Sequence, residues 1–240
     1  MIWKNIQENV CGGAEEQRDF LYDKSKKMEN IMIGNMKYYN NFLKDNLDLL
    51  LQSELKTIKD WKSFNRNNSH MLEYYDGSRF INRIRQYLHS KECIEWVENE
   101  LGVEGLVVDV QGTGEGASLM KQDDMLDAHI DFNWNNRIKM HRAVNLLIYV
   151  GECQGGDFYA LDPDQNEIFC KEPKHNSAIL IEHSETISHG VKPVIEGERY
   201  AIRQFYYKSD ATCDKPHQSL YWYNPEKKWY NPEKQMPTNS

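Results

Sequence analysis

The stretch Leu126-Asp-Ala-His-Ile-Asp-Phe132 is the part of the sequence from which a fold can first be inferred. It is a short, largely apolar run that follows a polar, Asp-rich segment, which predicts a β-strand. Residues two apart in a strand point to the same face, so His129 and Asp131 would present an imidazole and a carboxylate together. Two histidines and one carboxylate on one face of an octahedron are typical of non-haem Fe(II) sites.

The facial arrangement needs a third ligand, which must come from another segment. The His-x-Asp triplet alone is weak evidence, because chance gives about 0.5 such triplets in a chain of this composition. His189, within Ser188-His-Gly-Val191, lies in a later predicted strand and is the natural candidate. A competing triplet, His183-Ser-Glu185, is followed beyond His189 only by His217, near the C-terminus. We therefore interpret His183 and Glu185 as structural or rim residues.

The residue pattern changes from helix-favouring to strand-favouring after Gly102. Short β-favouring runs then alternate with Gly, Pro, Asp and Asn, and no long helical pattern separates them. Strands are predicted at 106–110, 117–120, 126–132, 143–150, 157–161, 167–170, 178–181, 188–191 and 199–207. This pattern predicts a mainly β, jelly-roll or cupin-like core rather than βαβ units.

The flanking regions differ from this core. Residues 14–59 are dense in Glu, Lys, Leu and Met, and apolar stripes at 80–88 and 94–101 predict two further helices, the first capped by Ser78 and the second ending at Gly102. We expect residues 1–105 to be mostly helical and to pack on a catalytic core at 106–209. Residues 210–240 contain a tandem repeat, Trp222-Tyr-Asn-Pro-Glu-Lys227 and Trp229-Tyr-Asn-Pro-Glu-Lys234, and are expected to form an appended aromatic tail.

The length, charge and cysteine content of the sequence argue against some classes of binding partner. With 240 residues, 40% hydrophobic, the chain can bury a sizeable core in one domain. A net charge of −8 argues against a nucleic-acid partner. The absence of a long apolar run or signal-peptide pattern predicts no membrane partner and a cytoplasmic location. Five scattered cysteines are expected to be reduced thiols, and nothing in the sequence indicates an oligomeric state.

A set of segments in fixed order resembles the prolyl-4-hydroxylase-type branch of the Fe(II)/2-oxoglutarate-dependent oxygenases. The resemblance spans about residues 94–208 and rests on the strand at 126–132, Arg142-Ala-Val-Asn-Leu-Leu-Ile-Tyr-Val150, Gly155-Gly-Asp-Phe158, Ser188-His-Gly-Val-Lys-Pro-Val194 and Arg199-Tyr-Ala-Ile202. It implies a double-stranded β-helix core. It also implies that His129, Asp131 and His189 bind iron.

The same resemblance implies two residues for the far carboxylate of 2-oxoglutarate, Arg199 and Tyr149. The planar guanidinium of arginine suits a carboxylate, which supports Arg199. Arg203 lies four residues further on the same strand face and could contact the co-substrate, or instead pair with a carboxylate of the protein. Tyr149 could alternatively be an ordinary core aromatic.

The implied reaction consumes O2 and 2-oxoglutarate, releases succinate and CO2, and hydroxylates an unactivated C–H bond. Asp131 stands where related halogenases have Gly or Ala, which favours hydroxylation, although desaturation, cyclisation and epimerisation fit the same site. The compact chain has no peptide-binding repeat, so we favour a small metabolite or amino-acid derivative as substrate. A protein or peptide prolyl hydroxylase is the main alternative, and a catalytically silent binding module is disfavoured by the complete ligand set.

Overall fold

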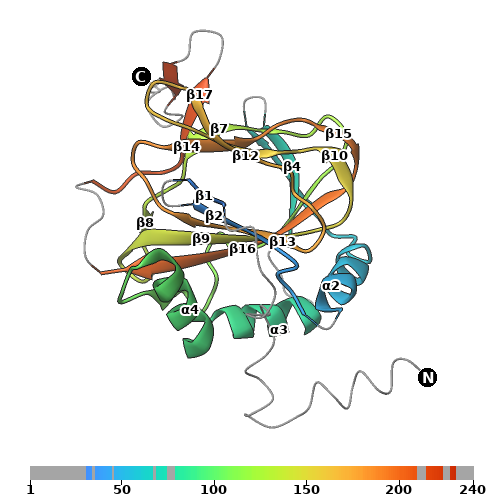
Figure 1. Cartoon of the computed structure of the whole chain (residues 1–240), viewed down its shortest axis with the longest axis horizontal. Helices are drawn as coiled ribbons and strands as arrows, with labels where there is room; N and C mark the ends of the chain where they lie inside the picture. The colour runs from blue at the N-terminus through green and yellow to red at the C-terminus, as the bar shows by residue number, and fades with distance from the viewer. Residues whose placement is uncertain are drawn as a thin grey trace, which may run out of the picture.

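The computed structural model describes residues 31–33, 36–44, 46–66, 69–74, 79–209, 215–223 and 228–230. Within these residues, two large antiparallel sheets face one another, and three helices cover the outer face of the larger one (Figure 1). The predicted mainly β, jelly-roll architecture is therefore confirmed.

The larger sheet has ten strands. Its order is β1 (Ile31–Ile33), β2 (Met36–Asn40), β13 (Ser177–Glu182), β9 (Met140–Val150), β16 (Arg199–Lys208), β6 (Gly116–Met120), β4 (Ser69–Tyr74) and β3 (Lys62–Arg66), with β5 (Val107–Val108) beside β16 and β8 (Trp134–Asn135) beside β9. Alternate residues of β9 serve two layers: Val144, Leu146 and Ile148 pack toward the helices, whereas Asn145, Leu147 and Tyr149 line an interior cavity.

The smaller sheet has six strands and carries the segment from which the fold was inferred. Its order is β12 (Glu167–Lys171), β11 (Phe158–Leu161), β14 (Ser188–Val191), β7 (Leu126–Ile130), β17 (Leu220–Tyr223) and β18 (Lys228–Tyr230), while β10 (Cys153–Gly155) pairs separately with β15 (Val194–Gly197). Strands β7 and β14 are neighbours, and their register sets His189 directly opposite His129.

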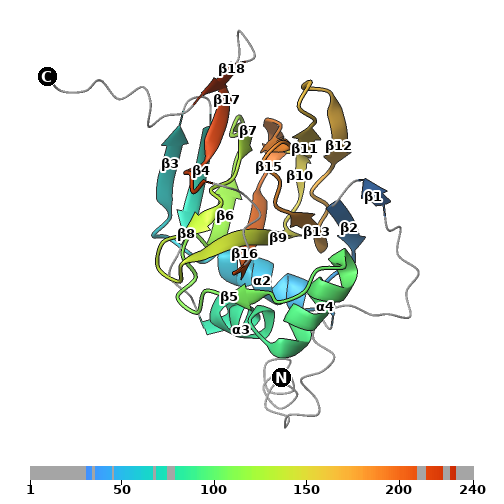
Figure 2. The same ribbon diagram turned by 90° about the vertical axis from the view of Figure 1, so that its left-hand side faces the viewer.

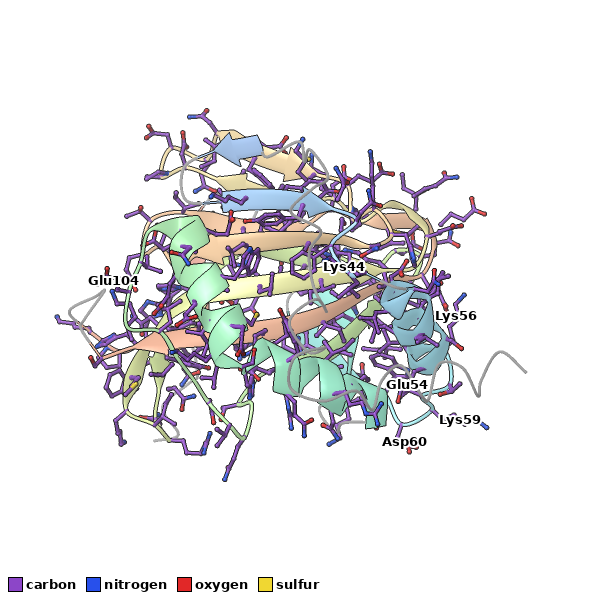
Figure 3. All side chains as sticks on the ribbon, turned by 60° about the horizontal axis from the view of Figure 1, so that its bottom comes forward. Lys44, Glu54, Lys56, Lys59, Asp60 and Glu104 are labelled. Atoms are coloured by element: carbon purple, nitrogen blue, oxygen red, sulfur yellow. The ribbon has the colours of Figure 1, made fainter. Side chains whose placement is uncertain are left out.

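Among the described residues, the outer layer consists of α2 (Leu47–Leu55), α3 (Arg79–Leu88) and α4 (Lys91–Leu101), which are seen below the sheet in Figure 2. Helix α4 begins where the Ser90 side chain accepts a hydrogen bond from the Cys93 amide, and it ends at Gly102 in the left-handed conformation (φ 68°). Charged side chains such as Lys56 and Lys59 lie at the periphery of this layer, as Figure 3 shows.

Burial of apolar side chains holds the layers together. One cluster fills the space between helices and sheet and includes Leu51, Leu88, Val97, Leu146 and Tyr206, each at most 1% exposed. Complete burial of such a side chain typically contributes about 1.5–3 kcal/mol. Because this layer fixes β9 and β16 from outside, their inward-facing side chains are held in defined positions.

The N-terminal region differs from the expectation of a mostly helical segment. Strands β1 to β4 occupy 31–33, 36–40, 62–66 and 69–74, and within the described residues up to 59 only α2 is helical. Strand β2 pairs with β13 over five residues, which places Met36 and Tyr38 inside the barrel and Tyr39 toward the helices. This long-range pairing outweighs the local helical preference of Met and Lys. The start of the expected helix, at 14–30, and Ser78 lie outside the described residues.

The C-terminal region was expected to be an appended tail, yet part of it is integral to the smaller sheet. Leu220 pairs with Ile130 and Tyr221 with His129, so β17 extends the sheet beside β7. Much of the tandem repeat, at 224–227 and 231–234, lies outside the described residues. In the part of the chain that the structure describes, no helix has the length and apolar character required to cross a membrane.

Candidate metal centre and co-substrate pocket

Three side chains with metal-binding atoms converge between the sheets. His129 comes from β7, Asp131 follows it directly, and His189 comes from β14. One ligand atom from each lies within 4.8 Å of the other two. Nε2 of His129 is 3.5 Å from Oδ1 of Asp131, and Nε2 of His189 is 3.4 Å from Oδ2 of the same carboxylate. The structure therefore brings the three predicted ligands together.

The imidazole of His129 is oriented for binding through Nε2. Its Nδ1 lies 2.9 Å from the backbone carbonyl oxygen of Asp127, which can only accept a hydrogen bond. This contact favours the tautomer with the proton on Nδ1, in which the lone pair of Nε2 faces Asp131. A second interaction of this kind is a usual feature of histidines that bind metals.

His189 is kept neutral by its surroundings. Burial lowers its pKa to about 3, although the nearby Asp131 carboxylate acts in the opposite direction. The neighbouring Gly190 permits β14 to approach β7 closely, because a Cβ there would lie 2.6 Å from the backbone oxygen of Leu126. A neutral imidazole is the form that binds a metal ion.

The carboxylate of Asp131 is ionised, and two side chains of β9 contact it. Burial alone would raise its pKa, but the positive charge of Arg142 beside it outweighs burial and holds that pKa well below its usual range. Arg142 lies 3.0 Å from Oδ2, and Asn145 donates a hydrogen bond to the same oxygen over 2.8 Å. Neither residue was predicted to act at the site from the sequence.

A cavity of about 250 Å³ connects the three side chains with the predicted co-substrate residues. Tyr149 and Arg199 both line it, and both are at least 96% buried. The guanidinium carbon of Arg199 lies 4.7 Å from the centroid of the Tyr149 ring. The Tyr149 hydroxyl and the Nε of Arg199 make no hydrogen bond of ordinary geometry to other described residues. Such groups call for a ligand, because a buried polar group without a partner is unfavourable.

Two details shape this end of the cavity. Burial raises the pKa of Tyr149 to about 12, so its hydroxyl keeps its proton and can donate. Gly156 adopts a left-handed conformation (φ +69°), and a Cβ there would lie 2.9 Å from Cδ of Arg199. The absence of a side chain at Gly156 therefore makes room for Arg199.

Arg203 lines the same cavity but has a protein partner. Its guanidinium forms an ion pair with Glu73 of β4. Arg203 was considered as a co-substrate contact or as the partner of a protein carboxylate, and the structure shows the ion pair with a protein carboxylate. The Nε atom of Arg199, in contrast, makes no hydrogen bond to other described residues, and its guanidinium lies beside the Tyr149 ring.

His183 and Ser184 of the competing triplet line a second, smaller cavity of about 120 Å³, which also borders Asp131 and His189. Nε2 of His183 is 3.0 Å from one oxygen of Glu185, and Nε2 of His217 is 2.8 Å from the other. The Nε2 atoms of His183 and His217 therefore both contact Glu185, and neither histidine belongs to the group of His129, Asp131 and His189.

Two residues that border the site, Asn145 and Tyr221, were not predicted from the sequence, although only one of them left a signal there. Asn145 shares an inward face with Leu147 and Tyr149, so the period-two pattern of β9 carried a signal for it. Tyr221 carried none, because its place depends on pairing between β17 and β7 across about ninety residues.

Comparisons with known proteins agree with this geometry. The family model of the 2OG-Fe(II) oxygenase superfamily matches residues 116–207, which include all three metal-binding candidates, Tyr149 and Arg199. No curated protein matches the chain significantly.

Several solved structures share the fold. A Pseudomonas putida prolyl-4-hydroxylase is 16% identical (TM-score 0.55) over 74% of this chain and 94% of its own. A prolyl hydroxylase from Trichoplax adhaerens, in complex with a hypoxia inducible factor peptide fragment, is 20% identical (TM-score 0.53) over 72% of this chain and 84% of its own. A prolyl 4-hydroxylase from Phytophthora capsici is 15% identical (TM-score 0.54), with 75% and 60% covered. The expected double-stranded β-helix is confirmed.

Proposed function

We propose that this chain, whose residues 116–207 match the family model of the 2OG-Fe(II) oxygenase superfamily, hydroxylates an unactivated C–H bond of a small metabolite or amino-acid derivative. In this proposal His129, Asp131 and His189 hold Fe(II). The observation that carries it is the convergence of these three side chains within 4.8 Å in a cavity that also contains Arg199 and Tyr149.

The donor set fits the metal. Two imidazole nitrogens and one carboxylate would leave the remaining coordination positions for co-substrate and O2, as is typical of non-haem Fe(II) oxygenases. When bound, Fe(II) and 2-oxoglutarate supply the oxidising chemistry, in which O2 is consumed and succinate and CO2 are released. The chain itself fixes the ligands: the Asp127 carbonyl orients His129, and Arg142 and Asn145 orient Asp131.

The opposite end of the cavity fits the far carboxylate of 2-oxoglutarate. Arg199 offers a permanent charge with a free Nε, and Tyr149 offers a hydroxyl proton beside it. Both are buried, so the interaction takes place in a medium of low dielectric constant, where a charge-assisted hydrogen bond is strong.

The pairing of β17 with β7 favours a small substrate over an extended peptide. An extended peptide commonly binds by adding a strand to a free sheet edge. Beside the strand that carries His129, that edge is already paired with β17 of the same chain. The cavity volume of about 250 Å³ must also accommodate 2-oxoglutarate, which leaves little space for a long side chain.

A second candidate function is a peptide prolyl hydroxylase with the same iron site. It is favoured by one observation, namely that the Trichoplax adhaerens structure of the same fold is, by its title, a prolyl hydroxylase bound to a peptide fragment. Desaturation, cyclisation or epimerisation would use the same residues and differ only in the fate of the oxidised substrate.

The test is a substrate screen on the Fe(II)-loaded protein. Free amino acids, nucleosides and short proline-containing peptides are supplied with 2-oxoglutarate, and succinate is measured above the substrate-free background. Stimulation by a free amino acid or nucleoside supports the proposal, whereas stimulation by prolyl peptides alone contradicts the small-molecule part. His189→Ala is the control that must show no stimulation with any compound.

A further inference from the structure

The segment from Lys215 to Tyr221 runs antiparallel to strand β7, which carries His129, and to the residues that follow this strand. Tyr221 pairs with His129, and the Phe132 amide donates a hydrogen bond to the Ser219 hydroxyl over 3.2 Å. Further along, the His217 amide donates to the side-chain oxygen of Asn133 over 2.8 Å. These contacts fix the register of the segment against β7.

The same segment is tied to the connection between β13 and β14. The side-chain amide of Asn133 donates to the carbonyl of Lys215 and to Glu185, each over 3.0 Å. His217 contacts the second oxygen of Glu185 at 2.8 Å. Segment 215–221 therefore joins the two strands that supply His129 and His189.

Tyr221 is the residue that this arrangement brings into the site. It is 4% exposed, and its ring stacks on the imidazole of His129 with centroids 5.1 Å apart and planes 19° apart. The guanidinium carbon of Arg66, on β3, lies 5.2 Å from the ring centroid. The ring lines the same cavity as the three metal-binding candidates.

We propose, on the basis of the function proposed above, that Tyr221 is a specificity-determining residue that forms the wall of the substrate compartment beside His129. The co-substrate residues Arg199 and Tyr149 come from β16 and β9 of the opposite sheet, whereas Tyr221 comes from β17. A rigid aromatic face suits contact with the apolar part of a small substrate. The substrate is thus positioned by the C-terminal strand, and 2-oxoglutarate is not.

The placement of Tyr221 can be tested without a known substrate. Fluorotyrosine is introduced at position 221, or at Tyr87 of helix α3 as a control on the outer side of the large sheet, and the protein is loaded with Mn(II) or with diamagnetic Zn(II). Mn(II) is expected to broaden the fluorine resonance at 221 beyond detection and to leave that at 87 visible. Equal resonances at 221 with both metals, with metal bound at one equivalent, would overturn the proposal and leave the iron site intact. Failure to bind either metal would instead contradict the proposed function.

The effect on substrate is measured with the compound that most stimulates succinate release in the amino-acid, nucleoside and prolyl-peptide panel. Tyr221→Ala is expected to raise the KM for that compound about tenfold, with less product per succinate, while the KM for the co-substrate stays unchanged. Tyr221→Phe keeps the ring and should stay near the wild-type values. Leu220→Ala changes the adjacent residue of the same strand, which does not line the cavity, and should leave both constants unchanged.

Two results would contradict a role in specificity. An unchanged KM and unchanged coupling in Tyr221→Ala would show that the ring does not contact substrate. A parallel loss of metal, of affinity for the co-substrate and of activity would show that the ring only supports His129. If no compound in the panel stimulates the enzyme, the substrate part of the proposed function fails, and the fluorine measurement decides the position of Tyr221.

Discussion

Asn145 donates a hydrogen bond from Nδ2 to the Oδ2 atom of Asp131 over 2.8 Å. Its own Oδ1 accepts a hydrogen bond from Nε of Arg142 over 2.6 Å. Arg142 in turn lies between two aromatic rings, with its guanidinium carbon 3.5 Å from the Phe205 centroid and 4.4 Å from that of Phe132. The orientation of the Asp131 carboxylate therefore depends on β9 and β16 of the large sheet as well as on β7.

The contact between Asn145 and Asp131 predicts a loss of metal affinity when it is removed. Asn145→Ala is expected to weaken Fe(II) binding about 10–100-fold, because the carboxylate loses a donor that orients it. Anaerobic Fe(II) titration measures the effect. Leu147→Ala, two residues along the same inward face, is the control, since it removes volume without removing a hydrogen bond. Equal losses in both variants would attribute the effect to packing.

The three metal-binding candidates predict a spectroscopic result. Protein loaded anaerobically with Fe(II) and 2-oxoglutarate should show the weak visible charge-transfer band of a chelated keto acid. His129→Ala and His189→Ala should each abolish it, because two remaining ligands do not hold the facial geometry. His183→Ala should retain the band, since His183 pairs with Glu185. A band that persists in both ligand variants would refute the assignment.

The two cavity arginines predict unequal effects on the co-substrate. Arg199→Ala should raise the KM for the co-substrate roughly 30-fold or more, since losing a buried charge-assisted pair costs about 2–5 kcal/mol. Arg203→Ala should change this KM far less, because Arg203 is paired with Glu73, and its main effect should be on stability. Steady-state succinate formation at varied 2-oxoglutarate concentration measures the effect in both variants. A larger effect at Arg203 would reverse the assignment.

Local periodicity was sufficient to predict some of these features. The alternation of residues in a strand predicted that His129 and Asp131 share a face, and the Gly102 helix end followed from residue type alone. Strand β2 could not be predicted, because it depends on pairing with β13 about 140 residues away. The same limit hid Tyr221, whose strand pairs with β7 from the far end of the chain.

The presence of Asp131 predicts the kind of product. With chloride present, the stimulated reaction should give a product that gains one oxygen atom, because the carboxylate occupies the position that a halide would need. Mass spectrometry of the product, with ¹⁸O2 as the oxygen source, measures this. A loss of two hydrogens would indicate desaturation or cyclisation at the same site, and a chlorinated product from the unaltered protein would contradict the role given to Asp131.

The cluster around Glu185 predicts how stability depends on pH. Partial burial would raise the pKa of Glu185, but hydrogen bonds from His183, Asn133 and His217 outweigh burial and lower it from 4.5 to about 2. A carboxyl group with a depressed pKa in the folded state contributes stability above its unfolded pKa, and that contribution is lost as the pH falls from about 4.5 toward 2. Glu185→Gln should therefore lower the unfolding temperature of the metal-free protein at pH 7, and the difference from wild type should shrink below pH 4.5.

Glu182 provides a control of opposite sign on the neighbouring strand β13. Burial raises its pKa, despite the opposing charge of Lys208, so its ionised form is less favourable in the folded state than in the unfolded chain. Glu182→Gln should accordingly leave stability unchanged or raise it at pH 7, and its difference from wild type should also vanish in acid, where the carboxyl group is protonated in both states. Differences of the same sign in the two variants would show that loss of the side-chain charge, and not the hydrogen-bonded cluster, determines the result. A destabilisation by Glu185→Gln that stays constant down to pH 3 would likewise contradict the role of the ionised carboxylate in tying segment 215–221 to the site.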